Sequence, residues 1–194
     1  AWMHYALGTT LSQIMAVLSS HLSFKISEGG LVDMWRRLAE ILGEWYEAIC
    51  EEARSSAVLH ADETGWRVNG KTHWLWCFTS KDLTCYFINR SRGSPALLQF
   101  MGETFGGCLV TDFWSAYNLI AADSRQYCLA HLFRELDKVD ERNKSDEWAA
   151  FRKKLTRLLK DAIRLDKSEV SDDAWDSRYA KLLDRLHALI RESG

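Results

Sequence analysis

The chain begins with a helical pattern of apolar positions. Apolar residues recur at steps of four and three from position 31 to position 49, which predicts one long helix over residues 31–53. The same spacing predicts a shorter helix over residues 7–18. Gly29 and Gly30 lie between the two patterns and predict a break in the chain there.

The pattern changes to short apolar runs at residue 57. The run over residues 57–62 predicts a strand, and Asn69-Gly70 lies between two aromatic-rich runs. Because Asn-Gly favours the left-handed conformations of a tight turn, these runs predict a hairpin. Further along, the pattern predicts a strand over 83–91, a helix from Ser94 to Gly102, a strand over 106–113, a short helix over 114–122 and a strand over 125–130 that runs into another helix. The predicted order is β-β-β-α-β-α-β-α.

The last part of the chain is helical again. Apolar positions predict two amphipathic helices, over residues 148–162 and 175–189. The polar loop over residues 166–173 separates them, so we expect the two helices to pack antiparallel.

Composition places the chain among soluble globular proteins. Its 194 residues are 47% hydrophobic and 27% charged. No apolar stretch approaches the ~18 residues that span a membrane. The five cysteines include no C-x-x-C pair, which favours reduced thiols and a cytoplasmic location over a disulfide framework or a zinc ribbon. The chain lacks an initial Met and stops abruptly, which favours a piece of a longer protein.

The net charge of −2 conceals an uneven distribution. Residues 28–63 contain nine acidic and three basic residues, whereas residues 142–167 contain nine basic and four acidic residues. A basic surface suits nucleic acid, because each neutralised phosphate releases counterions. A solvated helix face is the alternative explanation. We expect a basic DNA-binding surface formed by Lys153, Lys154, Arg157, Lys160 and Arg164.

The order of the predicted elements is similar to the core of the ribonuclease H-like fold. That fold is an α/β structure with a mixed sheet, in which three antiparallel strands are followed by α-β-α-β and the first and fourth strands are neighbours. Asp62 and Asp112 would then meet at the centre of the sheet. Such carboxylates repel each other unless a divalent cation lies between them, and Mg²⁺ suits oxygen ligands. Alternatively, Asp112 caps the next helix.

Four stretches carry a resemblance to a known family. "HADETGWRVNGKTHWLW", "SRGSPALLQF", "LVTDFWSAYN" and "RQYCLAHLFREL" resemble the core of the bacterial insertion-sequence transposases of family sixty-six. The resemblance covers roughly residues 1–165. These are DDE enzymes with a ribonuclease H-like catalytic domain. The resemblance implies that Asp62 and Asp112 are the first two members of the catalytic triad and bind Mg²⁺ or Mn²⁺.

The third member of the triad has no match in the chain. In the family, the catalytic Glu follows an inserted helical segment, in a stretch resembling N-N-x-x-E-R, and no such stretch occurs over residues 113–194. We expect this Glu beyond Gly194, with Glu135 as the substitute within the chain. The chain as given is therefore expected to cut no DNA. The expected domains are an N-terminal helical segment (1–55), a partial catalytic core (56–142) and a helical insertion (143–194).

Several other residues are candidates for a role near the site. His131 and Arg134 lie one turn apart, and the family resemblance implies a similar pair that holds a DNA phosphate or orients a metal-bound carboxylate; a structural His is the alternative. Glu63 follows Asp62, so on a strand it points to the opposite face. Arg90 and Arg92 precede a predicted helix N-terminus, a place where phosphates bind; exposed loop arginines without a ligand are the alternative.

The sequence therefore predicts the central part of a DNA transposase. Its expected chemistry is metal-dependent cleavage of DNA at transposon ends and transfer of the freed strand to target DNA. A nuclease or resolvase on the same fold is one alternative, and a decayed transposase that only binds DNA is another. The expected partner is DNA, with no membrane contact. The oligomeric state stays open, with a homo-oligomer of the full-length protein among the options.

Overall fold

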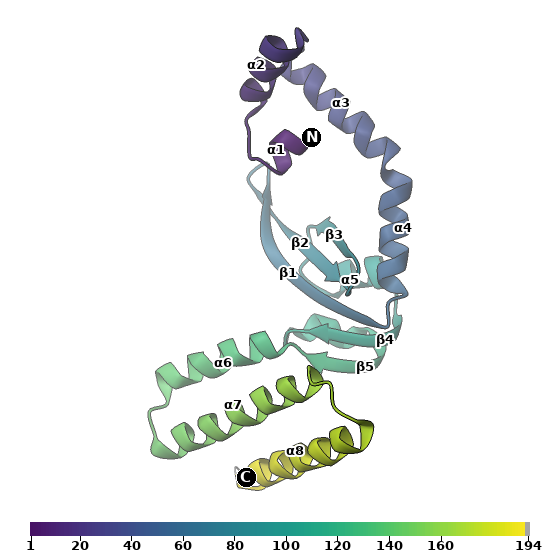
Figure 1. Ribbon diagram of the computed structural model, residues 1–194. Helices are drawn as coiled ribbons and strands as arrows, with labels where there is room; N and C mark the ends of the chain where they lie inside the picture. Colours follow the sequence, from purple (N-terminus) through teal and green to yellow (C-terminus); the bar gives the residue numbers. More distant parts are fainter. Residues whose placement is uncertain (193–194) are drawn as a thin grey trace. The chain divides into compact units, whose positions relative to one another are not determined.

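The computed structural model describes residues 1–192. The chain divides into two compact units, residues 1–126 and residues 127–194 (Figure 1). The first unit contains a sheet with helices, and the second is helical in its described part. The three domains expected from the sequence divide the chain differently, and their boundaries stay a prediction.

A five-stranded mixed sheet forms the centre of the first unit. Its order is β3-β2-β1-β4-β5, with β1 antiparallel to β2, β2 antiparallel to β3, and β1 parallel to β4. The strands are β1 (Val58–Val68), β2 (Lys71–Thr79), β3 (Thr84–Asn89), β4 (Thr104–Thr111) and β5 (Ala121–Tyr127). The mixed α/β class and the adjacency of the first and fourth strands are confirmed.

The hairpin between β1 and β2 forms at the predicted turn. Asn69 and Gly70 have φ angles of 50° and 74°, the left-handed values that this turn requires. β1 is longer than the run over residues 57–62 suggested, since it pairs with β2 from His60 to Val68. Asp62 therefore lies inside a strand.

Four helices precede the sheet: α1 (Trp2–Tyr5), α2 (Leu11–Leu22), α3 (Glu28–Ile41) and α4 (Gly43–Arg54). The prediction of one helix over residues 31–53 is wrong at two points. The hydroxyl of Ser27 accepts the N–H of Gly30 at 3.1 Å, so a helix begins at Glu28 and the glycines lie in its first turn. The rod formed by α3 and α4 is interrupted at Leu42, next to the helix-weakening Gly43 (Figure 1).

The segment after β4 also differs from its prediction. In place of a helix over residues 114–122, the structure has a 3₁₀ turn, η1 (Ser115–Leu119), and β5 begins at Ala121. The N–H of Ala121 donates to the carbonyl of Glu103 at 2.8 Å. This bond brings the chain into the sheet four residues earlier than the apolar pattern over residues 125–130 suggested.

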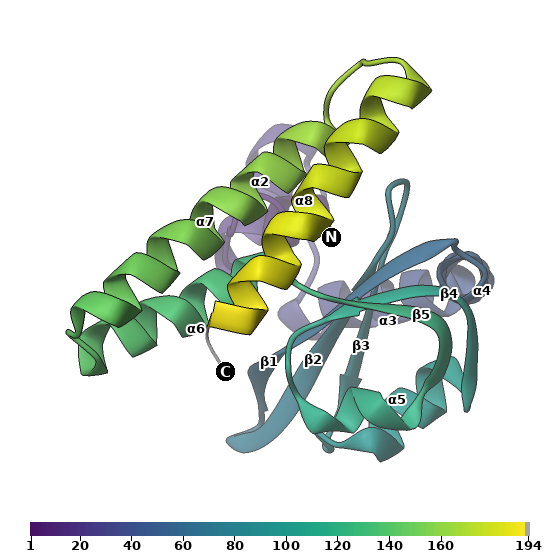
Figure 2. The ribbon, with the colours of Figure 1, turned by 90° about the horizontal axis from the view of Figure 1, so that it is seen from below.

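The hydrophobic core lies on one face of the sheet. Residues from α4, from α5 (Ser94–Met101) and from η1 pack there against inward-facing residues of the strands. Figure 2 shows the ribbon of α5 beside the sheet. Phe78 on β2 and Phe100 on α5 stack with ring centroids 3.9 Å apart, and Trp76 meets Tyr117 edge to face at 6.1 Å. All of these rings are buried. The core fixes which residues of β1 and β4 point inward.

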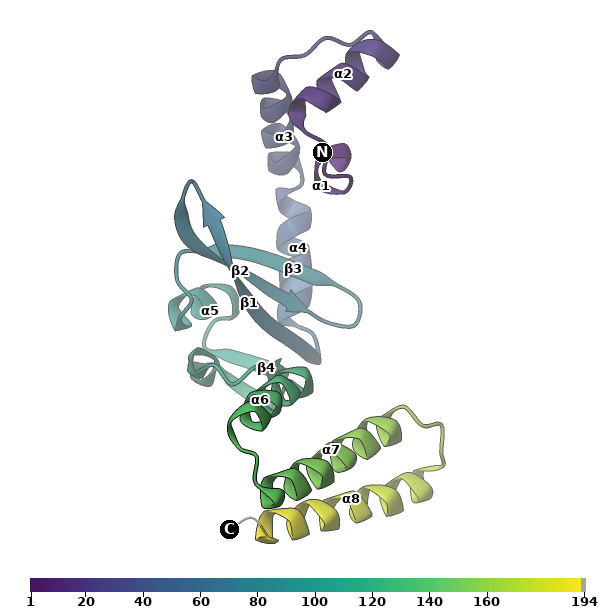
Figure 3. The ribbon, with the colours of Figure 1, turned by 90° about the vertical axis from the view of Figure 1, so that its left-hand side faces the viewer.

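The described part of the second unit consists of α6 (Leu129–Arg142), α7 (Asp146–Asp166) and α8 (Asp172–Glu192). The helices α7 and α8 run antiparallel beside each other, which confirms the predicted pair (Figure 3). Ser145 caps α7 by accepting the N–H of Trp148 at 3.2 Å. Arg152 joins α7 to α6 through Asp137 and Asp140, at 2.7 and 3.3 Å. None of the helices within residues 1–192 is long and apolar enough to cross a membrane.

Candidate functional site

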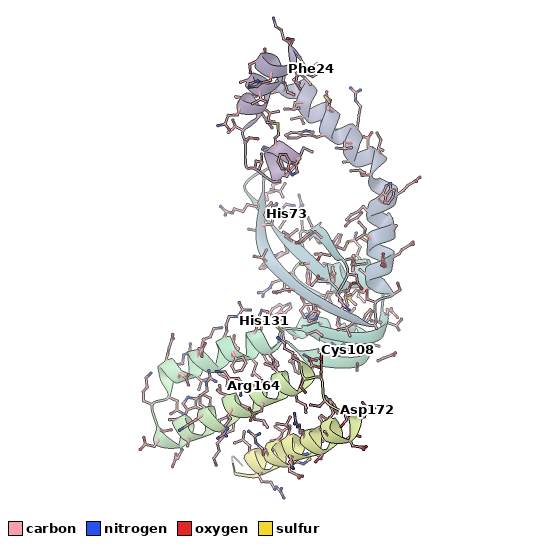
Figure 4. All side chains as sticks on the ribbon, viewed as in Figure 1. Phe24, His73, Cys108, His131, Arg164 and Asp172 are labelled. Atoms are coloured by element: carbon pink, nitrogen blue, oxygen red, sulfur yellow. The ribbon has the colours of Figure 1, made fainter. Side chains whose placement is uncertain are left out.

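The pairing of β1 with β4 brings the segments that carry Asp62 and Asp112 side by side. The parallel ladder pairs Val58 with Cys108, which is labelled on β4 in Figure 4, and ends with His60 paired to Val110. Each pair differs by the same number of positions, so the register, continued by two residues, places Asp62 opposite Asp112. In a parallel pair, residues at the same register point to the same face of the sheet.

Burial along β1 shows which face this is. Leu59 and Ala61 are 0% and 4% exposed and belong to the core cluster. Because successive side chains alternate, His60 and Asp62 point to the opposite face of the sheet. The pKa of Cys77 on β2, which is paired with Asp62, is consistent with this placement. Burial raises the pKa of the Cys77 thiol, and the charge of the Asp62 carboxylate raises it further.

Each aspartate accepts a hydrogen bond from a backbone N–H close to it in sequence. The N–H of Glu63 donates to Oδ1 of Asp62 at 2.9 Å, and the N–H of Trp114 donates to Oδ1 of Asp112 at 2.9 Å. Asp112 thus caps a local turn, close to the capping role that the sequence left open, although η1 itself has no side-chain cap. Oδ2 of Asp112 makes no hydrogen bond to the described residues.

The two carboxylates act on the same neighbouring group. The pKa of Tyr117 is raised far above its ordinary value of 10.0, first by burial and then by the hydrogen bond to Glu63. The charges of Glu63, Asp112 and Asp62 raise it further. Asp62 and Asp112 are therefore both close enough to the Tyr117 hydroxyl to affect its ionisation.

The chemistry of this donor set fits a hard divalent cation. Mg²⁺ is usually held by one or two carboxylates, with waters and substrate phosphates as its other ligands. Asp62 and Asp112 provide two carboxylates at matching register. Within residues 1–192, no three His, Cys, Asp or Glu side chains form a group that could hold a metal ion. The third triad member remains an expectation.

Glu135, the substitute for that third carboxylate, lies on α6 and is engaged elsewhere. Its Oε1 forms an ion pair with Nζ of Lys138, one turn along the same helix, at 2.6 Å. Its side chain is 54% exposed.

Glu63 is the main residue near the site whose binding partners could not be identified from the sequence. As expected from its position after Asp62, it points to the opposite face, where its side chain is 1% exposed. It accepts hydrogen bonds from Nε of Arg92 at 3.0 Å and from the hydroxyl of Tyr117 at 2.5 Å. Alternation along β1 predicts a buried charge at this position, and such a charge needs a partner. Nothing in the sequence indicates which basic residue provides it. Arg92, expected to contact a phosphate, is the residue that does.

A basic groove lies on the second unit. It has a volume of about 710 Å³ and is lined from the end of α6 along α7. Its exposed basic residues on α7 recur at steps of four, three and four, which places them on one side of the helix: Lys153, Arg157, Lys160 and Arg164. The first three of these make no ion pair with the described residues, and Arg164 pairs with Asp161 at 3.4 Å.

The other expected DNA contacts lie outside this groove. Lys154 lines two smaller pockets, formed with α8. His131 and Arg134 lie near the start of α6, one turn apart, as the sequence indicated. His131 is labelled in Figure 4. The contact of any of these residues with DNA stays a prediction.

Comparison with known proteins identifies the family of this chain. The search of curated proteins finds no match to this chain. The family model described as "Transposase IS66 family" matches residues 1–194, the whole chain. That match agrees with the resemblance carried by the stretches around Asp62 and Asp112, and it shows that the chain belongs to the IS66 family of transposases.

Proposed function

We propose that this chain carries the catalytic core of a DDE transposase, with Asp62 and Asp112 as two carboxylates of its metal site. The observation that supports this most is the parallel pairing of β1 with β4, whose register, extended two residues past its last pair of His60 with Val110, would align Asp62 with Asp112 on one face of the sheet. The strand order and the mixed pairing also agree with a ribonuclease H-like topology. The proposed reaction is cleavage of DNA at transposon ends, followed by transfer of the freed strand to target DNA.

The two aspartates hold and orient the metal ion in this proposal. Bound Mg²⁺ or Mn²⁺ supplies Lewis-acid chemistry, which makes an attacking hydroxyl more nucleophilic and stabilises the leaving oxygen of a phosphodiester. The local N–H bonds to Oδ1 fix the direction of each carboxylate. This fixed direction matters because catalysis by preorganised charge depends on groups that need not rearrange during the reaction.

DNA is the proposed partner of the helical unit. Lys153, Arg157, Lys160 and Arg164 lie along one side of α7 and line one groove, as expected for contacts to successive phosphates. Phosphate contacts add affinity without sequence specificity. Lys154, His131 and Arg134 are proposed as further contacts.

A metal titration tests the proposal directly. We expect the chain to bind Mn²⁺ weakly but measurably, followed by the loss of the electron paramagnetic resonance signal of the free ion. Asp62→Asn and Asp112→Asn should each weaken that binding by at least about tenfold, because each removes a charged oxygen ligand. Asp123→Asn on β5 is the matched control, since it removes an exposed carboxylate from the same sheet. Wild-type binding by both site variants would contradict the proposal.

A further inference from the structure

The ladder between β1 and β4 ends before the two aspartates. Its last pair is His60 with Val110, and Asp112 lies one residue past the end of β4. Strand pairing therefore does not fix Asp112 relative to Asp62. A site that binds one ion between two carboxylates needs another set of contacts to hold this geometry.

A group of side chains on the core face of the sheet makes those contacts. Glu63, next to Asp62, is 1% exposed, and both of its carboxylate oxygens are used. Oε1 accepts from Nε of Arg92 at 3.0 Å, and Oε2 accepts from the hydroxyl of Tyr117 at 2.5 Å. These three residues come from β1, from the loop before α5 and from η1 after Asp112. We call Glu63, Arg92 and Tyr117 the Glu63 cluster.

Arg92 is itself held in one orientation. Its guanidinium carbon lies 4.7 Å from the centre of the Trp74 ring and 4.4 Å from the centre of the Trp114 ring. The indole N–H of Trp114 also donates to the carbonyl oxygen of Arg92 at 3.4 Å. The Arg92 side chain is 40% exposed, yet its guanidinium contacts both indole rings as well as Glu63, and lysine cannot reproduce this arrangement.

The Glu63 cluster is connected to both aspartates through neighbouring residues. Glu63 is covalently adjacent to Asp62 and donates its N–H to Oδ1 of that residue. Trp114, which contacts Arg92, donates its N–H to Oδ1 of Asp112. The chain of contacts therefore runs from Asp62 through the Glu63 cluster to Asp112 without using the strand ladder.

The charges in this group favour a single arrangement. Glu63 is nearly inaccessible to solvent and is held by hydrogen bonds from Arg92 and Tyr117. A buried carboxylate is costly when its partner is absent, so displacement of Arg92 or Tyr117 from Glu63 is unfavourable.

We infer that Glu63, Arg92 and Tyr117 are positioning residues, which hold Asp62 and Asp112 at the separation that one divalent cation requires. This inference rests on the proposed function, because it assigns the cluster a role only if the two aspartates bind a metal ion. The cluster residues do not bind the ion. They hold in place the backbone segments that carry Asp62 and Asp112.

Two conservative variants test the inference. Arg92→Lys keeps the charge but loses the flat group between Trp74 and Trp114, and Tyr117→Phe removes one hydrogen bond to Glu63. We expect each to weaken Mn²⁺ binding by about tenfold, the lower end of the usual effect of a group that orients a metal ligand. The dissociation constant is measured by electron paramagnetic resonance, and the midpoint of thermal unfolding is measured for each variant.

Each variant has a matched control in the same unit. Arg54→Lys alters a guanidinium that lies 5.4 Å from the centre of the Phe100 ring and donates to the Phe100 carbonyl at 3.3 Å. Tyr46→Phe removes a hydroxyl that donates to the Tyr86 carbonyl at 2.8 Å. We expect these controls to lower the unfolding midpoint in the same way but to change Mn²⁺ affinity by less than about twofold, since they do not reach the aspartates.

The outcomes separate the inference from the proposed function. If Asp62→Asn and Asp112→Asn bind Mn²⁺ as the wild type does, the proposed function fails. If those two lose binding but Arg92→Lys and Tyr117→Phe keep wild-type affinity, only the inference fails. The inference also fails if the control variants weaken Mn²⁺ binding as much as the cluster variants do.

Discussion

The two units of this chain use charge in different ways. In the sheet unit, Glu63 is 1% exposed and its contacts with Arg92 and Tyr117 fix where each group lies. In the helical unit, Lys153, Arg157 and Lys160 are exposed and form no ion pair with the described residues. Buried, partnered charge defines geometry, whereas exposed charge provides a field that depends little on exact position. A metal site needs the first kind, and a phosphate-binding surface needs only the second.

The largest effect is expected when a carboxylate is removed from the sheet unit. In a protein that contains this chain together with the third carboxylate, acting on DNA with the ends of its element, Asp112→Asn should lower the cleavage rate by at least about a hundredfold, because the metal loses a charged ligand. DNA affinity, measured by fluorescence anisotropy, should change by less than about twofold, since the phosphate contacts are in the other unit. Cleavage at the wild-type rate would remove the distinction between the units.

A Cβ atom added at Gly107 should strongly destabilise the sheet unit. A Cβ at Gly107 would lie 2.7 Å from the carbonyl oxygen of Ala57 and 2.8 Å from that of Ser56, both backbone atoms that cannot move aside easily. We expect Gly107→Ala to lower the free energy of unfolding by about 1–3 kcal/mol, measured by urea denaturation. The matched control is Gly106→Ala, which meets nothing within 4 Å. Equal stability of the two variants would show that β1 and β4 can shift freely here.

Charge reversal should affect only the helical unit. Arg157→Glu combined with Lys160→Glu should weaken DNA binding by about tenfold and reduce the slope of log affinity against log salt by about two. Mn²⁺ binding should be unchanged, because neither residue lies in the sheet unit. Arg178→Glu with Lys181→Glu makes the same change of charge at the same spacing on α8, away from the groove. An equal loss of affinity in this control would indicate that total charge, and not the groove, binds DNA.

Alkaline pH should lower the free energy of unfolding of the sheet unit because of Tyr117. Its pKa is raised in the folded state, so above pH 10 the unfolded chain loses this proton first and stability falls as pH rises. Tyr117→Phe should make the free energy of unfolding fall less steeply above pH 10, by up to about 1.4 kcal/mol per pH unit. Urea denaturation between pH 8 and pH 11 measures the slopes. Identical slopes for variant and wild type would contradict the buried, partnered state of this hydroxyl.

The smallest expected effect concerns Glu135. Its carboxylate is 54% exposed and pairs with Lys138, and an exposed pair of this kind contributes little to stability. We expect Glu135→Gln to change Mn²⁺ affinity by less than about twofold, as is usual for an exposed position outside a site. Loss of Mn²⁺ binding in this variant would make Glu135 the third metal ligand.

The sequence predicted the parts of the fold that depend on local pattern. The Asn69-Gly70 turn and the antiparallel pair of C-terminal helices are confirmed. The adjacency of the first and fourth strands is nonlocal; it was predicted from the similarity to the ribonuclease H-like fold and is confirmed as well. The errors of the prediction fell where one nonlocal or side-chain contact decides the outcome. Ser27 begins α3 before the apolar pattern does, and the bond from Ala121 to Glu103 extends β5.

The candidate site was predictable only in part for a related reason. Asp62 and Asp112 end apolar runs, so each is visible as an isolated polar residue in its own stretch. The partners of Glu63 come from two distant segments, and no periodicity connects Arg92 or Tyr117 with β1. Such a cluster becomes visible only when the three segments are placed together in space.

The central claim is that Asp62 and Asp112 share one divalent cation. A crystal structure of the chain soaked in Mn²⁺, with anomalous data collected above the manganese edge, tests it most directly. We expect an anomalous peak between the two carboxylates, with at least one oxygen of each within about 2.5 Å of the ion. Carboxylates on opposite faces of the sheet, a separation above about 10 Å, or a peak that contacts neither aspartate would contradict it.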